Sequence, residues 1–410
     1  MARLITESTS PRGAYNPQMD VLVVDLGSRF IRAGKADPFP NEKEPWVVTP
    51  AEAVVRDLNA PTATTAANGL DGANGGAAAA GTERVVCPVV KGEIADWDVL
   101  EACLDHVLYD RITWGRGAEG GMLLAEPNFL SRADRERLCQ LMFEVFNLAG
   151  YYGADQAVLS MYALGRSSGT VIDIGHGKID IVPVLDGAPQ LSTAVRLPYG
   201  CQQLAQQLAT QLAARGISFL GSSSSSSSSS SSAAPGVAPA LEDLARSIVR
   251  VAGSPEEAAA AAEPTTHTLP DGQTITIQGE GQQLGEALMD GSRLGLDVAA
   301  LSEAVYTAAT AQGDKDTRKA WLEGMMVCGG GSSVPGLGGR LLKEVRGLTT
   351  QQITPLLCSL PEYMPEGTLR HAAWMGGAVL ARVAFSQAGG FITKADYEEQ
   401  GPAAVLKKCV

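Results

Sequence analysis

One pattern occurs twice, once in each half of the chain. Residues 21–28 read VLVVDLGS and residues 170–177 read TVIDIGHG. In both, a β-branched apolar run ends in an aspartate, a glycine turn follows, and a second apolar run begins. This order of residues is typical of a strand, a tight turn and an antiparallel second strand. The chain is therefore expected to contain two similar hairpins, led by Asp25 and Asp173.

A third glycine-rich loop, residues 328–333 (CGGGSS), follows the apolar run at 325–327. Turns of this kind present backbone N–H groups, and a carboxylate beside them can reach a metal ion. Two such hairpins can hold a phosphate chain and its cation from opposite sides. The duplication predicts two similar lobes with a cleft between them.

Length and charge limit the classes of protein to consider. A chain of 410 residues is too long for a single core and suggests two lobes. The 45 acidic and 32 basic residues give a net charge of −13, which disfavours direct binding to nucleic acid. Seven scattered cysteines without C-x-x-C spacing indicate reduced thiols in the cytosol or nucleus. No apolar run reaches membrane-spanning length, so no membrane contact is expected.

Several stretches have a composition that cannot bury enough apolar surface to order them. Residues 1–20 are predicted to be a disordered extension, and residues 59–81 and 221–240 mobile surface loops. The serine run at 222–232 belongs to the last of these. The Ala- and Glu-rich segment 253–264 is compatible with either a short helix or a loop.

The segments between these loops alternate between strand and helix patterns. Apolar residues at helical spacing predict helices over 97–109, with Asp96 as the N-cap, and over 156–164. A third predicted helix, over 132–146, would bury Leu138, Leu141, Met142 and Val145 on one face. Residues 170–185 are predicted to form paired strands. Strands interleaved with helices indicate an α/β protein.

Short motifs over most of the chain resemble actin, in the same order and at nearly the same spacing. They lie at residues 23–28, 156–166, 269–273, 329–330, 335–336, 374–377 and 396–409. A narrower set resembles the plant nuclear actin-related proteins, a group implied in chromatin remodelling. Its members are the segments GHGKIDI at 175–181, HTLP at 267–270 and PEYMPE at 361–366.

The resemblance implies the α/β fold that actin shares with heat-shock chaperones and sugar kinases, with two similar lobes around a nucleotide cleft. The first lobe would contain residues 21–165 and 371–410, and the second residues 166–370. A sugar kinase is the weakest alternative, because no sugar-site insertion is recognisable.

The resemblance also implies a site for ATP or ADP with Mg²⁺ or Ca²⁺. Asp25 and Asp173 would hold the cation through its water molecules, and Gln156 would position the attacking water. The alternatives without a functional role are that each aspartate only caps a turn and that Gln156 is an ordinary polar surface residue. The residues expected around the nucleotide are Gly27, Ser28, Arg29, Arg32, Gly175, Gly177, Gly329, Gly330, Gly331 and Arg370.

Departures from actin concentrate in this same site. Arg29 replaces a small residue, and two interpretations stay open: it strengthens phosphate binding as a fixed charge, or it fills the space and excludes nucleotide. His176 replaces an acidic residue, and Asp180 stands where actin has a histidine that organises the catalytic water. Ala245, Arg246 and Ser333-Val334 alter the purine side. We therefore expect nucleotide binding with at most weak ATP hydrolysis.

Filament contacts are also expected to be lost, since residues 59–81 and 289–293 lack the apolar anchors that actin uses. The resemblance implies a structural subunit of an ATP-dependent chromatin-remodelling complex, located in the nucleus, with the cytoplasm as a second location. Its partners would be a helix of the remodeller's motor subunit and other actin-related proteins or nuclear actin. The main alternative is an ATP-hydrolysing, actin-like cytoskeletal protein.

Overall fold

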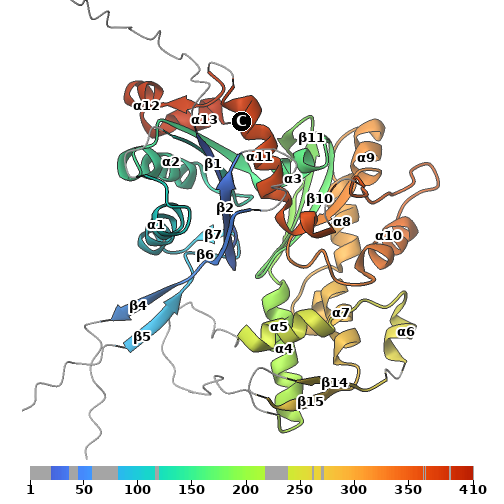
Figure 1. Ribbon diagram of the computed structural model, residues 1–410. Coiled ribbons are helices and arrows are strands. Elements are labelled where there is room, and N and C mark those ends of the chain that lie inside the picture. The colour runs from blue at the N-terminus through green and yellow to red at the C-terminus, as the bar shows by residue number, and fades with distance from the viewer. Residues whose placement is uncertain are drawn as a thin grey trace, which may run out of the picture.

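The computed structural model describes residues 20–36, 45–57, 82–115, 120–217, 239–260, 263–268, 272–362, 364, 366–386 and 389–409. The expected loops at 1–20, 59–81 and 221–240 lie outside this part of the chain, apart from Asp20 and residues 239–240. Two large β-sheets with helices packed on them form most of this described part (Figure 1). No helix in the described part is both long enough and apolar enough to cross a bilayer.

The first sheet has six strands in the order β17-β9-β8-β1-β2-β3. One of its faces packs against α1, α2 and the C-terminal helices, and the other against α3 and α11 (Figure 1). The strands are β1 (Val21–Leu26), β2 (Phe30–Lys35), β3 (Val47–Pro50), β8 (Gly121–Glu126), β9 (Gly150–Asp155) and β17 (Ile392–Thr393). The helices are α1 (Trp97–Asp105), α2 (Arg132–Gln140), α3 (Gln156–Ala163), α11 (Ala372–Ala384), α12 (Lys394–Gln400) and α13 (Val405–Lys408).

The second sheet follows the order β12-β11-β10-β16, with β13 also paired to β11. Its strands are β10 (Gly169–Ile174), β11 (Ile179–Leu185), β12 (Ala188–Pro189), β13 (Val195–Leu197) and β16 (Met325–Cys328). Its core is built with α4 (Cys201–Ala214), α5 (Pro239–Ile248), α7 (Glu280–Met289), α8 (Leu301–Thr310), α9 (Lys315–Leu322) and α10 (Leu337–Leu348). Smaller elements are the hairpins β4 (Ala53–Asp57)–β5 (Thr82–Val86), β6 (Val89–Val90)–β7 (Glu93–Ile94) and β14 (Thr265–Thr268)–β15 (Thr274–Ile277), and α6 (Pro255–Ala259).

The two predicted hairpins are confirmed, and they have the same register. Asp25 of β1 lies opposite Arg32 of β2, and Asp173 of β10 lies opposite Asp180 of β11. Each hairpin also has a parallel neighbour, β8 for β1 and β16 for β10. The repeat seen in the sequence is thus a repeat of strand pairing, and it places the two aspartates at equivalent points of the two sheets.

Two helices, α3 and α11, pack between the sheets (Figure 1). They approach so closely that a Cβ at Gly376 of α11 would lie 1.6 Å from the carbonyl oxygen of Leu159 in α3. On α3, Leu159 packs into the cluster on the first sheet, while Val158 and Met161 pack against the second. This helix pair therefore joins the two lobes at the closed end of the cleft.

The helix predicted over 97–109 begins as expected, because the Asp96 side chain accepts a hydrogen bond from Val99 N at 3.0 Å. It continues as a π-helix over His106–Arg111. The segment 253–264, left open between helix and loop, contains the short helix α6, whose N-cap is Ser254.

The helix predicted over 132–146 is correct in extent, but the prediction that Val145 is buried was wrong. Leu138, Leu141 and Met142 are buried, whereas Val145 is 50% exposed and Phe146 takes the inner position. The reason is a change to π-helix over Leu141–Val145, closed by the hydrogen bond from Phe146 N to Leu141 O. The extra residue per turn rotates Val145 away from the core.

Candidate functional site

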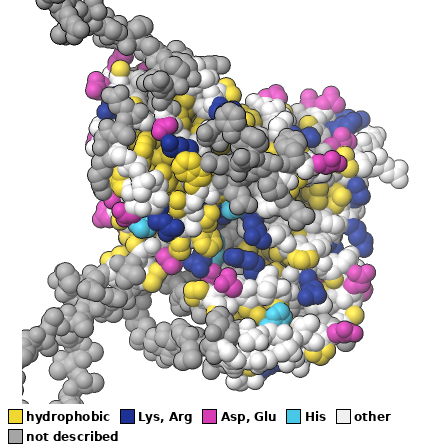
Figure 2. Space-filling view, viewed as in Figure 1, with side chains coloured by type: hydrophobic (Ala, Val, Ile, Leu, Met, Phe, Trp, Pro, Cys, Tyr) yellow, Lys and Arg dark blue, Asp and Glu magenta, His cyan; other side chains and the backbone are white. Residues whose placement is uncertain are grey.

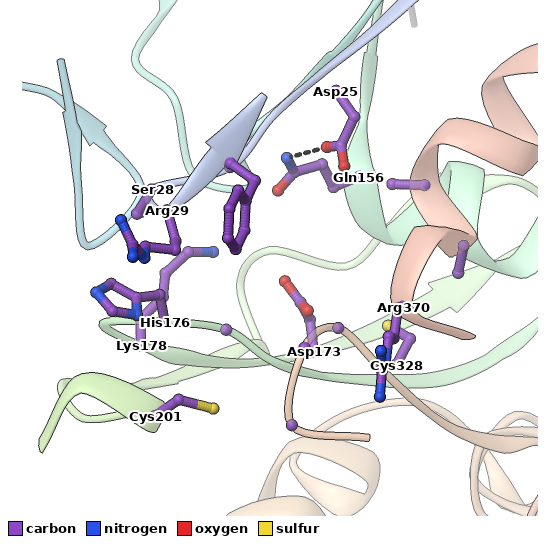
Figure 3. Close-up of a pocket in the computed structure, with 18 of the residues that line it drawn as sticks. Asp25, Ser28, Arg29, Gln156, Asp173, His176, Lys178, Cys201, Cys328 and Arg370 are labelled. Atoms are coloured by element: carbon purple, nitrogen blue, oxygen red, sulfur yellow. Dashed lines mark hydrogen bonds between the residues drawn. The ribbon is translucent and has the colours of Figure 1, made fainter. Parts of the chain in front are cut away.

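A cleft lies where the turns of the two hairpins and the loop after β16 meet (Figure 3). Asp25 and Gln156 reach it from one side and Asp173 from the other. All the residues expected from the sequence to bind nucleotide, except Gly177, line this cleft. Figure 2 shows Lys and Arg side chains gathered around the hollow between the lobes.

Asp25 is nearly buried, and both of its carboxylate oxygens already have partners. Oδ1 accepts a hydrogen bond from Gln156 Nε2 at 2.8 Å, and Oδ2 is paired with Arg32 Nη1 at 2.9 Å. Gln156 Nε2 also donates to the carbonyl oxygen of Leu26 at 2.9 Å. Gln156 is therefore held by the end of β1, with its amide donors in use.

Asp173 differs, since no described residue donates a hydrogen bond to its side chain. Burial raises the pKa of Asp173; Lys178 opposes this shift, and the charges of Asp180 and Asp25 add to it. Two facing carboxylates of this kind are stabilised by a cation placed between them. Asp173 is thus the carboxylate with capacity left for a metal.

The side chains at this site suit a divalent ion that arrives bound to phosphate. They do not form a site in which the protein supplies most of the metal ligands. Within the described residues, no group of three or more His, Cys, Asp or Glu side chains is placed to hold a metal. Mg²⁺ in nucleotide sites keeps several waters and binds one or two carboxylates plus phosphate oxygens. Asp173 matches that requirement, while Asp25 faces Asp173 across the cleft with both of its oxygens already paired.

The two hairpin turns are built alike and leave N–H groups available. In each turn the first glycine N–H, Gly27 or Gly175, bonds to the carbonyl three residues further on, at 3.1 and 2.9 Å. The next N–H groups, those of Ser28 and Arg29 and the equivalent pair in the second turn, make no backbone hydrogen bond to a described residue. Successive unpaired N–H groups form a concave anion site.

The glycine loop after β16 closes the cleft beside Asp173. Gly329 has φ +83°, and a Cβ there would lie 2.2 Å from Asp173 Oδ1. Gly330 faces open space, and the Gly331 N–H donates to Ile174 O at 2.9 Å. Glycine at 329 and 331 therefore lets this loop approach the second hairpin closely.

The remaining predicted residues have less direct places. Gly177 does not line the cleft; it packs toward Lys91 in the turn between β6 and β7. Arg370 is exposed at the rim and donates to Ser333 Oγ at 3.3 Å. The apolar side chains that line the cleft include Leu204, Ala245, Val249 and Val334.

A buried cluster around Asp180, missed in the sequence, occupies the position next to the cleft. Arg196 donates to both oxygens, at 2.7 and 3.0 Å, Asn128 donates at 3.2 Å, and Lys178 forms a close ion pair. Asp180 is fully buried. Asp180 stands out in the sequence as a departure from actin, and its two-residue spacing from Lys178 puts both on one face of a strand, but nothing in the sequence connects them to Arg196 or Asn128.

The Arg29 side chain matches neither of the two interpretations left open by the sequence, because it is held in ion pairs with Glu242 and Glu52 at the lining of the cleft. Its Nε lies 2.9 Å from Glu242 Oε2 on α5, and its Nη1 lies 3.5 Å from Glu52. His176, from the opposite turn, lies 3.8 Å from Glu242. Burial, together with Arg29 and Arg246, lowers the pKa of His176 to about 4, so this histidine is neutral at physiological pH.

Comparisons with known proteins agree with this architecture. The family model described as Actin matches residues 16–410. Actin-related protein 7 of rice (Oryza sativa subsp. indica) is 39% identical over 95% of this chain and 100% of its own length. Actin-related protein 7 of Arabidopsis thaliana is 37% identical over the same shares, and actin-related protein 2 of Saccharomyces cerevisiae is 26% identical over 96% and 98%. The chain has the actin-like fold and belongs to the actin family, among the actin-related proteins.

Proposed function

We propose that this protein is a nuclear, structural subunit of an ATP-dependent chromatin-remodelling complex. In this proposal its cleft binds ATP or ADP with Mg²⁺ or Ca²⁺ and hydrolyses ATP weakly at most. The support for the nuclear role is the resemblance of residues 175–181, 267–270 and 361–366 to nuclear actin-related proteins. The support for nucleotide binding is the cleft itself.

The observation that best supports a structural role is that both carboxylate oxygens of Asp180 already accept hydrogen bonds. Hydrolysis of a phosphoanhydride requires an oriented water and a group to accept its proton. Burial alone would raise the pKa of Asp180, but Lys178 and Arg196 outweigh it and lower the pKa. A carboxylate already accepting hydrogen bonds at both oxygens, with a lowered pKa, is a poor base.

The side-chain amide of Gln156 is also already hydrogen-bonded within the protein. Its Nε2 donates to Asp25 and to the carbonyl oxygen of Leu26, leaving only its Oε1 to contact a water. This geometry orders the end of β1 and keeps Asp25 in place. In the proposal, Gln156 positions a cleft residue and contributes little to turnover.

Binding rests on groups that stay available. Asp173 would hold the cation through water, and the N–H groups of both hairpin turns would receive the phosphates. When bound, the cation would offset the facing charges of Asp173 and Asp25. Arg32 would stay paired with Asp25 at the edge of the phosphates.

The cytoskeletal alternative is disfavoured by the segment at 289–293. It begins at the end of α7 and turns through a 3₁₀ helix, Gly291–Leu294, capped by the Asp290 side chain on Ser292 N at 3.0 Å. Gly291 packs against the ring of Tyr199, while Ser292 and Arg293 are exposed. A polar turn held against its own lobe offers no apolar anchor to a second subunit.

Affinity purification of the native protein from nuclear extract, with identification of the bound proteins, tests the role. The motor subunit of a remodelling complex should copurify, together with other actin-related proteins or nuclear actin. The Asp173→Asn variant should copurify the same set, because nucleotide is a structural filler in this proposal. Recovery of cytoskeletal proteins without a remodeller subunit would contradict it. So would loss of the complex in a well-folded Asp173→Asn variant.

A further inference from the structure

An ion pair crosses the mouth of the cleft and joins the two lobes. Arg29 lies in the β1–β2 turn of one lobe, and Glu242 lies in α5 of the other, with Arg29 Nε 2.9 Å from Glu242 Oε2. Their side chains are 22% and 13% exposed, so water screens the pair only partly. Figure 3 shows Arg29 beside His176 of the opposite turn, where the two hairpins approach each other.

The positive charge of Arg29 is already offset by carboxylates without a ligand. Glu52 lies 3.5 Å away on the other side of the guanidinium, so two carboxylates face one cation. His176, 3.8 Å from Glu242, adds no positive charge when neutral. The guanidinium also lies 5.2 Å from the centre of the Phe30 ring, which helps to hold it at the turn. A polyphosphate that enters the cleft must therefore compete with Glu242 and Glu52 for Arg29.

Arg29 belongs to the turn that offers N–H groups to phosphate, and its backbone N–H makes no backbone hydrogen bond to a described residue. The phosphates of a ligand and the Glu242 carboxylate would thus both bind Arg29. Carboxylate and phosphate oxygens bind a guanidinium in similar geometry, so one can replace the other.

We propose that Glu242 acts as a built-in competitor of the nucleotide phosphates. It holds Arg29 across the mouth of the cleft, keeps the lobes together when no nucleotide is present, and lowers the affinity for polyphosphate. Only the identity of the ligand rests on the function proposed above; the connection between the lobes does not.

Three variants test this in the purified full-length protein. Glu242→Gln removes the competing charge, and Arg29→Gln removes the shared cation. Asp243→Asn is the matched control, because it removes the same charge from the neighbouring position of α5, where Asp243 is 75% exposed and lies 3.8 Å from Arg246. All four proteins are titrated with Mg-ATP, and amide hydrogen exchange is measured without nucleotide.

Glu242→Gln should bind Mg-ATP about five- to tenfold more tightly than the wild type. Arg29→Gln should bind more weakly, because Glu242 is left unpaired beside the phosphates. Without nucleotide, residues 27–32 and 239–248 should exchange faster in both variants, and Asp243→Asn should match the wild type in both measurements.

Unchanged or weaker binding by Glu242→Gln would overturn the competition. Unchanged exchange at 27–32 and 239–248 in Glu242→Gln would overturn the connection between the lobes. Failure of all four proteins to bind Mg-ATP would contradict the nucleotide site of the proposed function, and the exchange result would still decide whether the ion pair joins the lobes.

Discussion

The acidic residues in and beside the cleft differ in the hydrogen bonds and ion pairs that they already make, and this difference assigns their roles. Asp25 holds Gln156 and Arg32, and Asp180 is surrounded by Lys178, Arg196 and Asn128. Asp173 has no donor among the described residues. A partly buried carboxylate that no hydrogen-bond donor compensates costs stability, and such residues are commonly kept for binding.

Asp173→Asn is therefore expected to have two effects of opposite sign. Because the folded-state pKa of Asp173 is raised, its ionised form at pH 7 costs stability, and the amide should raise the melting temperature of the nucleotide-free protein. The same change should weaken Mg-ATP binding roughly 10- to 100-fold. Calorimetric melting and titration measure the two effects. A lower melting temperature without nucleotide, or unchanged affinity, would contradict this assignment.

His176 supplies a prediction for pH. Burial and the nearby Arg29 and Arg246 lower its folded-state pKa from 6.5 to about 4, so the unfolded chain takes up a proton first as the pH falls. As the pH falls from 6.5 to about 4, the free energy of unfolding of the wild type should decrease relative to that of His176→Gln by about 1 kcal/mol per pH unit. Urea unfolding of both proteins at several pH values measures the difference. A difference that is independent of pH would show that His176 is protonated equally in both states.

At the scale of elements, the lobes are joined where α3 and α11 touch. Gly376 has no room for a side chain, since a Cβ there would lie only 1.6 Å from the carbonyl oxygen of Leu159. Trp374, on the same helix, donates to Val23 O at 3.2 Å and anchors α11 on the first sheet. A shift of α11 would therefore disturb β1 and Asp25 at its end.

Gly376→Ala is expected to destabilise the protein by about 3 kcal/mol, because backbone must move to admit the methyl group. Gly339→Ala is the matched control: Gly339 lies in α10, and among the described residues no atom outside its chain neighbours and the backbone of its own helix lies within 4 Å of its Cβ position. That change should be neutral or stabilise by about 0.5–1 kcal/mol through helix propensity. Chemical denaturation of both variants decides, and equal effects would contradict the close approach of the helices.

Local patterns predicted most of these elements, and contacts between distant segments escaped prediction. The hairpins at Asp25 and Asp173 and the Asp96 cap depend on neighbouring residues, so their sequences were enough. The π-helical turn that exposes Val145 depends on how the helix end packs. Glu242 could not be assigned to Arg29, because more than half of the chain separates them and no periodicity connects them.

For the whole molecule, the absence of an apolar anchor in the described segment 289–293 predicts that copies of the chain do not assemble. The purified protein, in salt and Mg²⁺ at concentrations where actin pellets, should stay in the supernatant on sedimentation. Deleting residues 222–232 should not change this, since a serine run has no apolar side chains to bury. Ordered filaments in the pellet would contradict the role assigned to the polar turn.

The central claim is that the cleft holds nucleotide without turning it over efficiently. Its most direct test is phosphate release from Mg-ATP by the purified protein, with the bound nucleotide extracted and identified at the end. We expect protein that contains nucleotide, mostly as ATP, with very little phosphate released. Steady-state release at rates matching filamentous actin, or protein that never retains nucleotide, would contradict the claim.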